Sequence, residues 1–334
     1  MKAAVLVKPG DIQFQSLPIP APLPGEVRVK LRMTGICGSD VHFFNGDRLL
    51  GKPTIIGHEG LGEIDLVSGE IAQSLIGKRV VIEPNIPCRN CKQCLQGKGN
   101  ICPNKRIIGL NEPGCFAEYV CLPLQYCHIL PDSISDADAV TIEPMAVAYH
   151  ALFTARAKPG DTIAIMGLGA IGLLITHLAV SLGYRVLAND LFESKKTQAI
   201  AFGAIVNADF DENFSLASYW ETEQVSAVFE CSGSAKAASL VTANAPGFSQ
   251  VVLVGLSENL TSFQPLKIVR QGIEIIGSII YDHPFDFQRV IKLIERGIIQ
   301  PGRIISDNIP FSNISEAFAL AKTGVPSKII ISIN

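Results

Sequence analysis

The chain has 334 residues, of which 48% are hydrophobic and 18% charged, and its formal net charge is −3. These values are those of an ordinary soluble protein of two domains. Lysines and arginines are dispersed among acidic residues, apart from a small group at Lys98, Lys105 and Arg106 that we interpret as a solvated surface, so we expect no nucleic-acid partner.

The first ten residues do not resemble a secretory leader. Their apolar run is short and ends at Lys8 and Pro9. We therefore expect a cytoplasmic location, where clustered cysteines bind metal or act in catalysis more often than they form disulfides. One or two disulfides in an exported protein are the alternative.

Two short motifs with metal-ligand chemistry come next. Cys37 lies in Gly-Ile-Cys-Gly-Ser-Asp, His58 lies in Gly-His-Glu, and a carboxylate, Glu143, follows in Ile-Glu-Pro. Singly, each has an ordinary explanation: a buried thiol, a core histidine and a carboxylate at a helix start. Together, one thiolate, one imidazole and one carboxylate leave a fourth zinc position open, which is typical of a catalytic zinc site.

A separate group of cysteines lies between these motifs. The spacing Cys-x₂-Cys-x₂-Cys-x₇-Cys allows one loop to close around a tetrahedral ion. Four thiolates without a histidine or an open position indicate a structural zinc site. The residues are Cys88, Cys91, Cys94 and Cys102.

The middle of the chain predicts a nucleotide-binding unit. A buried strand over 162–166 precedes Gly-Leu-Gly-Ala-Ile-Gly, and a helix is expected over 173–182. Gly167 permits the turn, Gly169 lets the backbone approach a pyrophosphate, and Gly172 allows close packing of helix on strand. The loop residues expected to bind the cofactor are Gly167, Gly169, Ala170, Ile171 and Gly172.

A second strand, over 184–189, ends at Asp190, where a dinucleotide fold carries its acidic residue. Strands near 227–230 and 251–254 end before Gly233 and Gly255, so we expect an α/β sheet with its cofactor there. The apolar residues over 163–183 also permit a membrane helix. The glycines and the alternation of strands and helices favour a soluble α/β domain instead.

The whole chain resembles the zinc-containing medium-chain dehydrogenases, in the branch with sorbitol, threonine and butanediol dehydrogenases. The motifs occur in family order. They are Gly-Ile-Cys-Gly-Ser-Asp at 35–40, Gly-His-Glu at 57–59, the four-cysteine loop, Phe-Ala-Glu-Tyr at 116–119, Glu-Pro at 143–144, the glycine loop at 167–172 and Glu-Ala-Phe at 316–318.

The resemblance implies an α/β architecture in which a β-rich, chaperonin-10-like catalytic domain is joined to a Rossmann domain with a doubly wound parallel sheet. The catalytic zinc domain is expected at 1–147 and the NAD-binding Rossmann domain at 148–285. Residues 286–334 are expected to return to the catalytic domain. Relatives form dimers or tetramers, the dimer through the sheet edge near 278–280, so a homodimer or homotetramer is expected.

The resemblance also assigns roles at the zinc site. The ligands fall on Cys37, His58 and Glu143, and Glu143 in place of a cysteine points to the polyol branch. Glu59 is expected behind the metal, which it coordinates occasionally. Asp40 is expected to orient the imidazole of His58.

A proton path is implied by the same family. Ser39 is expected to receive the substrate proton, and His42 to pass it to solvent through the cofactor ribose; a surface histidine is the alternative for His42. Asp190 favours NAD over NADP because it would bind the ribose hydroxyls and repel a 2′-phosphate. Lys195 and Lys196 follow closely enough to offer a phosphate charge, although a solvent-facing position on a helix start is expected for both.

The implied activity is hydride transfer from a secondary alcohol of a polyol, vicinal diol or sugar acid to NAD, which gives a ketone. Zinc would lower the pKa of the bound alcohol toward neutral pH. Two departures matter: Gly114-Cys115 replaces a glycine pair, and the segment 277–284 lacks the arginine of sorbitol dehydrogenases. The alternatives are a lyase or epimerase on the same fold, or a non-enzymatic nucleotide-binding or structural protein.

Overall fold

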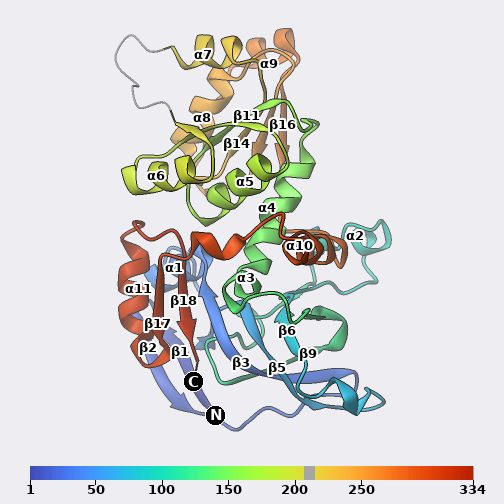
Figure 1. Cartoon of the computed structure of the whole chain (residues 1–334). Helices are drawn as coiled ribbons and strands as arrows, with labels where there is room; N and C mark the ends of the chain where they lie inside the picture. The colour runs from blue at the N-terminus through green and yellow to red at the C-terminus, as the bar shows by residue number, and fades with distance from the viewer. Residues whose placement is uncertain (207–214, 334) are drawn as a thin grey trace. The chain divides into compact units, whose positions relative to one another are not determined.

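The computed structural model describes residues 1–206 and 215–333, and the chain divides into two compact units (Figure 1). The first comprises Met1–Glu143 and Asp282–Asn334, and the second Pro144–Tyr281. Both junctions lie a few residues before the boundaries expected at 147 and 285. The first junction falls within one helix, α4 (Ile142–Thr154).

The first unit is rich in β-structure. Its sheets have the strand orders β2-β1-β4, β10-β6-β5-β3-β18-β17 with β9 also paired to β3, and β7-β8. The strands are β1 (Lys2–Lys8), β2 (Asp11–Ser16), β3 (Glu26–Ile36), β4 (Thr54–Ile55), β5 (Glu59–Val67), β6 (Arg79–Ile82), β7 (Asn85–Ile86), β8 (Arg106–Ile107), β9 (Tyr119–Pro123), β10 (Cys127–Ile129), β17 (Asp307–Pro310) and β18 (Ile329–Ser332).

The long strand β3 organises the largest of these sheets. Val27, Val29 and Leu31 are buried and alternate with charged residues, which is the period of a strand with one face in a core. It pairs antiparallel with both β5 and β18, so the C-terminal strand lies beside a strand from the start of the chain. The helices of this unit are α1 (Gly38–Asn45), α2 (Lys92–Leu95), α3 (Asp136–Val140), α10 (Phe285–Glu295) and α11 (Ile314–Lys322).

The second unit contains one parallel sheet with the strand order β13-β12-β11-β14-β15-β16. This is the order of a dinucleotide-binding fold, so the predicted α/β class is confirmed. The strands are β11 (Thr162–Met166), β12 (Arg185–Asn189), β13 (Ile205–Val206), β14 (Val225–Glu230), β15 (Gln250–Leu253) and β16 (Glu274–Gly277).

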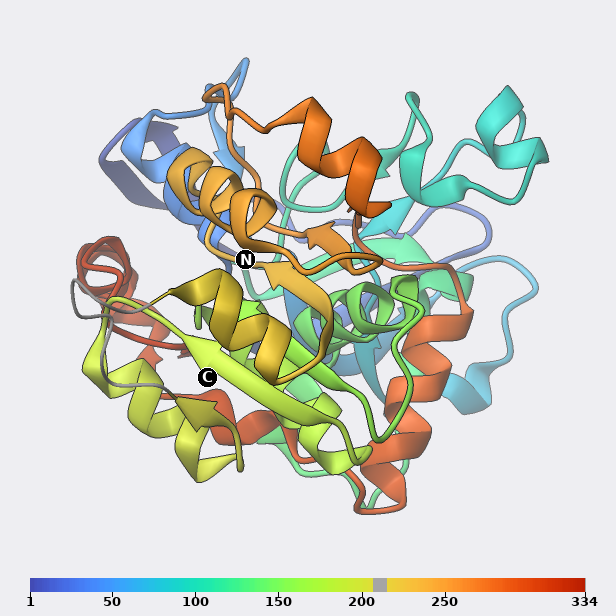
Figure 2. The same cartoon turned by 90° about the horizontal axis from the view of Figure 1, so that it is seen from above.

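Helices lie on both faces of this sheet (Figure 2). They explain why the central strands read as continuous apolar runs rather than alternating ones, since both faces are covered. The predicted helix at 173–182 is observed as α5, which begins three residues earlier. The helices are α5 (Ala170–Ser181), α6 (Glu193–Ala201), α7 (Leu216–Thr222), α8 (Ala235–Asn244) and α9 (Pro265–Gln271).

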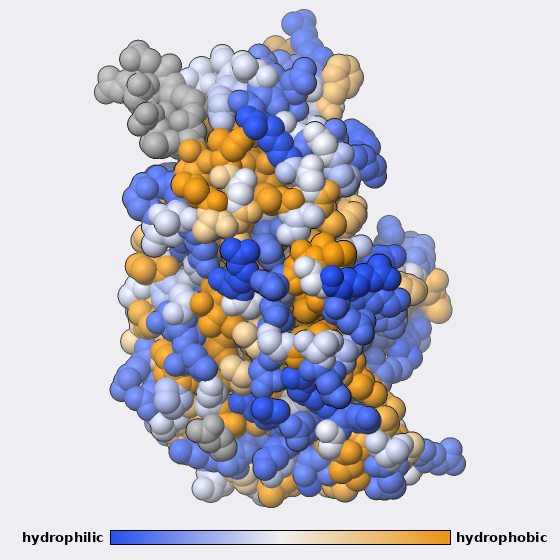
Figure 3. All heavy atoms as spheres, viewed as in Figure 1, coloured by the Kyte–Doolittle hydropathy of each residue, from blue (hydrophilic) through white to orange (hydrophobic). Residues whose placement is uncertain are grey.

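The hydrophobic run at 163–183 is thus a strand, a turn and a helix. Among the described residues, no helix has the length and apolar character needed to cross a membrane. Hydrophilic and hydrophobic residues are interspersed over the face drawn in Figure 3.

Candidate active site and metal centres

Sheet register in the first unit brings the first set of predicted metal ligands together. Gly35 in β3 pairs with Glu59 in β5, so the end of one strand lies beside the start of the other. Cys37 follows the first strand and His58 precedes the second. The ligand atoms of Cys37, His58 and Glu59 all lie within 4.8 Å of one another.

Asp40 fixes the two loops that carry these ligands. It is fully buried in α1. Its Oδ2 accepts the backbone N–H of Cys37 at 2.9 Å, and its Oδ1 accepts that of Gly57 at 3.2 Å. The same Oδ1 lies 3.5 Å from Nδ1 of His58. The carboxylate therefore lies beside the imidazole that it is expected to orient.

The electrostatics of this cluster favour a cation. Burial opposes charge on His58, but Asp40 and Cys37 outweigh it and raise the histidine pKa well above its ordinary value. Nδ1 of His58 and Oε1 of Glu59 are buried without a hydrogen-bond partner. Thiolate, imidazole and carboxylate are zinc ligands, so the residues present fit a zinc ion.

Glu59 is also held by a partner, Lys328, that no sequence motif indicates. The ammonium group of Lys328 forms an ion pair with Oε2 of Glu59 and donates to the carbonyl oxygen of Ile36 at 3.1 Å. Burial alone would lower the pKa of Lys328, but Glu59 and Cys37 raise it above its ordinary value. A charged lysine therefore neutralises the carboxylate of Glu59.

Gly35 provides the space for this ion pair. A Cβ atom at Gly35 would lie 1.8 Å from Oε2 of Glu59 and 2.9 Å from Cε of Lys328. Only a residue without a side chain fits there. In the sequence, Lys328 is visible only as a lysine that precedes a run of isoleucines. Its contact with Glu59 follows from the pairing of β18 with β3.

Glu143 lies in the first turn of α4 and is 5% exposed. Three residues, Cys37, His58 and Glu59, have ligand atoms within 4.8 Å of one another. Glu143 does not belong to this group. Its charge nevertheless acts on the cluster, because it raises the pKa values of Cys115 and Lys328. Cys115 itself is buried, and burial raises its pKa to about 12, so it is a core thiol.

The predicted proton path begins on α1. Ser39 is partly exposed and lies between Gly38 and Asp40 near the start of the helix. His42 is one turn further along, and its side chain is half exposed. Nδ1 of His42 lies 2.9 Å from Oδ2 of Asp47, so the ring is oriented rather than free.

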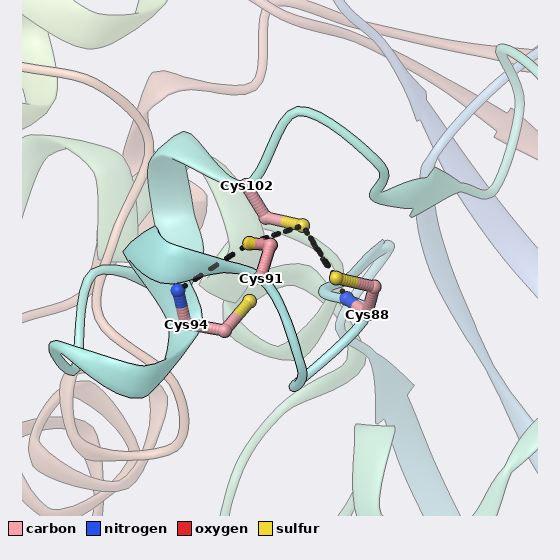
Figure 4. A group of neighbouring side chains, drawn as sticks. All are labelled: Cys88, Cys91, Cys94 and Cys102. Atoms are coloured by element: carbon pink, nitrogen blue, oxygen red, sulfur yellow. Dashed lines mark hydrogen bonds between the residues drawn. The ribbon is translucent and has the colours of Figure 1, made fainter.

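The second set of predicted ligands forms a compact cluster around α2 (Figure 4). Sγ of Cys102 lies 3.5 Å from Sγ of Cys88 and 3.8 Å from Sγ of Cys91. These separations exclude disulfides, and they match the roughly 3.8 Å expected between thiolates on a tetrahedral zinc ion with Zn–S bonds of about 2.3 Å. Cys94 completes the group of four.

Two of the four thiols differ in how readily they ionise. A backbone N–H at Asn90 lowers the pKa of Cys88 to about 6, and neighbouring thiols contribute. Desolvation and the other cysteines raise the pKa of Cys94 to about 12. One thiolate thus forms readily while a second is opposed, and a divalent cation would stabilise all four.

In the second unit, the glycine loop has the geometry of a phosphate-binding turn. Gly167 follows β11 with φ of +94°, and Gly169 caps α5. A Cβ at Gly172 would lie 1.9 Å from the carbonyl oxygen of Gly167, whereas one at Gly169 would meet nothing within 4 Å. The third glycine is therefore needed for packing, and the middle one leaves the helix N-terminus accessible to an anion.

Asp190 ties this loop to the end of β12. Its Oδ2 accepts the N–H of Leu168 at 2.6 Å, and its Oδ1 accepts the N–H of Phe192 at 2.9 Å. Both carboxylate oxygens retain lone pairs, so ribose hydroxyls can still donate to them. The carboxylate thus supports the loop and could accept further hydrogen bonds.

The two lysines after Asp190, which were expected to face solvent, both contact neighbouring side chains. Lys195 is 8% exposed, and its ammonium group lies 4.9 Å from the ring centroid of Phe192. Lys196 forms an ion pair with Glu193. The solvent-facing prediction is wrong for Lys195 because the aromatic ring covers its side chain.

Gly233 and Gly255 lie side by side after β14 and β15. A Cβ at Gly255 would lie 2.1 Å from the N atom of Gly233. Glu230 supports the same region, since its Oε1 accepts the N–H of Ser232 at 2.8 Å. The backbone therefore approaches itself closely where the cofactor was predicted to bind.

Each of the two units contains a segment that matches a known protein family. The family model of the alcohol dehydrogenase GroES-like domain matches residues 23–132, and that of zinc-binding dehydrogenases matches residues 170–296. Sorbitol dehydrogenase of Bacillus subtilis (strain 168) is 30% identical and covers 96% of this chain and 93% of its own. D-arabitol-phosphate dehydrogenase of Enterococcus avium is 31% identical and covers 100% and 98%.

A solved structure extends the likeness to the fold. An alcohol dehydrogenase from Escherichia coli CFT073, complexed with NADH, superimposes with a TM-score of 0.91. It is 26% identical in sequence and covers 99% of this chain and 99% of its own. The match therefore spans both units.

The Gly35–Glu59–Lys328 arrangement generates a first prediction. In Gly35→Ala, the new methyl group must displace the Glu59 carboxylate and the Lys328 side chain. Activity should fall about 10- to 100-fold, as is typical when a partner of a metal site is lost. Gly51→Ala is the matched control, since a Cβ there meets nothing within 4 Å. Equal steady-state rates in both variants would show that the ion pair has no functional role.

Proposed function

The chain belongs to the zinc-containing medium-chain alcohol dehydrogenases, and we propose that it oxidises a secondary alcohol of a polyhydroxylated compound, with NAD as hydride acceptor. It is a nicotinamide-dependent dehydrogenase that converts secondary alcohols to ketones. The observation that carries the proposal is the Cys37–His58 site in one unit, combined with the glycine loop and Asp190 in the other.

We assign the catalytic zinc to Cys37, His58 and Glu143, with the fourth position open to substrate. Zinc bound there supplies Lewis acidity that makes an alcohol easier to deprotonate. Glu59 is engaged by Lys328, which supports a position behind the metal rather than permanent coordination. The four cysteines from Cys88 to Cys102 would hold the structural ion.

We assign proton transfer to Ser39 and His42. The hydroxyl of Ser39 lies two residues after the ligand Cys37, and His42 follows on the same helix. Asp47 binds Nδ1 of the imidazole and leaves Nε2 for proton exchange. Asp40 holds the two ligand loops in place and does not itself transfer protons.

The second unit would bind the cofactor. Gly167, Gly169 and Gly172, with Ala170 and Ile171, would bind the pyrophosphate through backbone N–H groups at the start of α5. Gly233 and Gly255 lie at the carboxyl ends of β14 and β15, where ligands of such sheets bind. Asp190 would bind the ribose.

The substrate class follows from the branch of the family. Relatives that cover nearly the whole chain act on sorbitol and on D-arabitol phosphate. We therefore place the substrate among polyols and their phosphates, vicinal diols and sugar acids. This proposal retains the class expected from the sequence and adds the phosphorylated polyols.

We also propose a cytoplasmic homodimer or homotetramer. All nine cysteines lie in the described part of the chain and none of them is in a disulfide, which suits a reducing compartment. Strand β16 is an edge of the parallel sheet, and nearby Leu266, Val269 and Ile275 are exposed. An open apolar edge favours pairing with a second copy.

Turnover on a substrate panel tests the activity. Purified protein should form NADH, followed by its absorbance, with at least one polyol, polyol phosphate, vicinal diol or sugar acid. The ketone product should accumulate in equal amount, because the cofactor ends reduced. Product formation without net NADH would instead indicate an epimerase or lyase, and the proposed oxidation would be wrong.

Cofactor choice tests the role of Asp190. The wild type should use NAD better than NADP, and Asp190→Asn should narrow the gap about tenfold or more, since two unit charges near 4 Å repel by a few kcal/mol at a protein surface. Asparagine keeps one acceptor oxygen, which can serve the N–H of Leu168 or that of Phe192 but not both, so circular dichroism should accompany the kinetics to show that the variant is folded. The measurement is kcat/KM for both cofactors. A wild type that prefers NADP would contradict the assignment.

Variants on α1 test the proton path. Ser39→Ala should lower kcat roughly 10²- to 10⁴-fold, the range for losing a positioned proton-transfer group. His42→Ala should cost less, and its rate should rise toward alkaline pH, where buffer bases replace the relay. Added imidazole should rescue the His42 variant and not the Ser39 variant. If His42→Ala keeps the wild-type rate and pH profile, protons leave by another route.

A further inference from the structure

A third cluster of metal-ligand side chains lies in the first unit and shares no residue with the two sites assigned above. Glu83 directly follows β6, His128 lies in β10, and His283 precedes α10. Their ligand atoms all lie within 4.8 Å of one another. These three residues are far apart in the chain and belong to no motif, so no sequence pattern indicates them.

The carboxylate at the centre of this cluster is incompletely satisfied. Glu83 is fully buried, and its Oε2 accepts from Nε2 of His128 at 2.7 Å and from Nδ1 of His283 at 2.8 Å. Both contacts fall on one oxygen, while Oε1 is buried without a hydrogen-bond partner. A buried carboxylate oxygen left bare is costly, and such a group commonly marks the place of a water or an ion.

Aromatic packing fixes both imidazoles. The ring of His128 stacks on Phe287, with centroids 4.7 Å apart and an interplanar angle of 17°. The ring of His283 packs on Tyr126 with centroids 4.5 Å apart. Each histidine therefore presents one nitrogen to Glu83 in a set orientation, as metal ligands do when their surroundings orient them.

Two imidazoles and one carboxylate are a recognised ligand set for zinc. Ligand atoms on a tetrahedral zinc ion, with bonds of about 2.0–2.1 Å, lie about 3.3 Å apart. The observed 2.7 and 2.8 Å are hydrogen-bond lengths. Coordination therefore requires each imidazole to move outward by about half an ångström, a small displacement.

We propose that Glu83, His128 and His283 form a third metal site, which binds a divalent transition ion such as Zn²⁺. The ion takes the place of the two protons that now point at Glu83, and each imidazole carries its proton on its other ring nitrogen. Oε1 of Glu83 gains a partner if the carboxylate binds through both oxygens. The site ties the start of the C-terminal segment, at His283, to strands β6 and β10.

Cobalt is a suitable probe, because its spectrum distinguishes sulfur ligands from nitrogen and oxygen ligands. Wild-type protein that holds two zinc ions per chain, titrated with Co²⁺, should take up one further ion with visible ligand-field bands but without a thiolate charge-transfer band, since this site contains no sulfur. Metal analysis after desalting should count that ion in addition to the zinc already bound.

Variants identify the ligands independently of enzyme activity. Glu83→Gln, His128→Gln and His283→Gln should each abolish this sulfur-free cobalt spectrum. Tyr126→Phe is the matched control, because it keeps the ring that packs on His283 and all three ligands. Wild-type protein that takes up no sulfur-free cobalt would overturn the proposal even if a variant failed to fold. So would an unchanged spectrum in Glu83→Gln.

Discussion

Buried negative charge is the constraint around which the first unit is built. Asp40 and Glu59 are carboxylates with almost no exposure, and the thiol of Cys37 lies beside them. An uncompensated buried charge costs several kcal/mol. Backbone N–H groups stabilise Asp40, and the Lys328 ammonium stabilises Glu59. The thiol of Cys37 and the imidazole of His58 remain available to bind a cation.

The two predicted zinc sites differ in what positions their ligands. At the first site, sheet register and Asp40 position Cys37 and His58. The protein can therefore hold these ligands in place without supplying a fourth ligand to the metal. At the four cysteines, a short loop around α2 provides little core of its own. A cation bound by the four thiolates would hold this loop together. Three protein ligands would leave one zinc position open, whereas four thiolates would occupy every position.

Local patterns explain which features were predictable from sequence. The glycine loop and the four cysteines depend on residues close in the chain, so their spacing was sufficient, and the strand–turn–helix at 162–181 is observed. Lys328 lies 292 residues from Ile36, to which it donates, and its role appears only once β18 is paired with β3. Burial of Lys195 on Phe192 likewise depends on the turn into α6, which composition does not specify.

The most direct test of this account follows zinc release and NADH formation together while the protein is incubated with a chelator. The open site at Cys37 and His58 should lose its ion first, and turnover should disappear in step with that loss while the folded protein keeps the ion at its four cysteines. Circular dichroism recorded on the same samples reports the fold. Full turnover after the more labile ion has gone would contradict the account, as would loss of activity only when the cysteine-bound ion leaves and the protein unfolds.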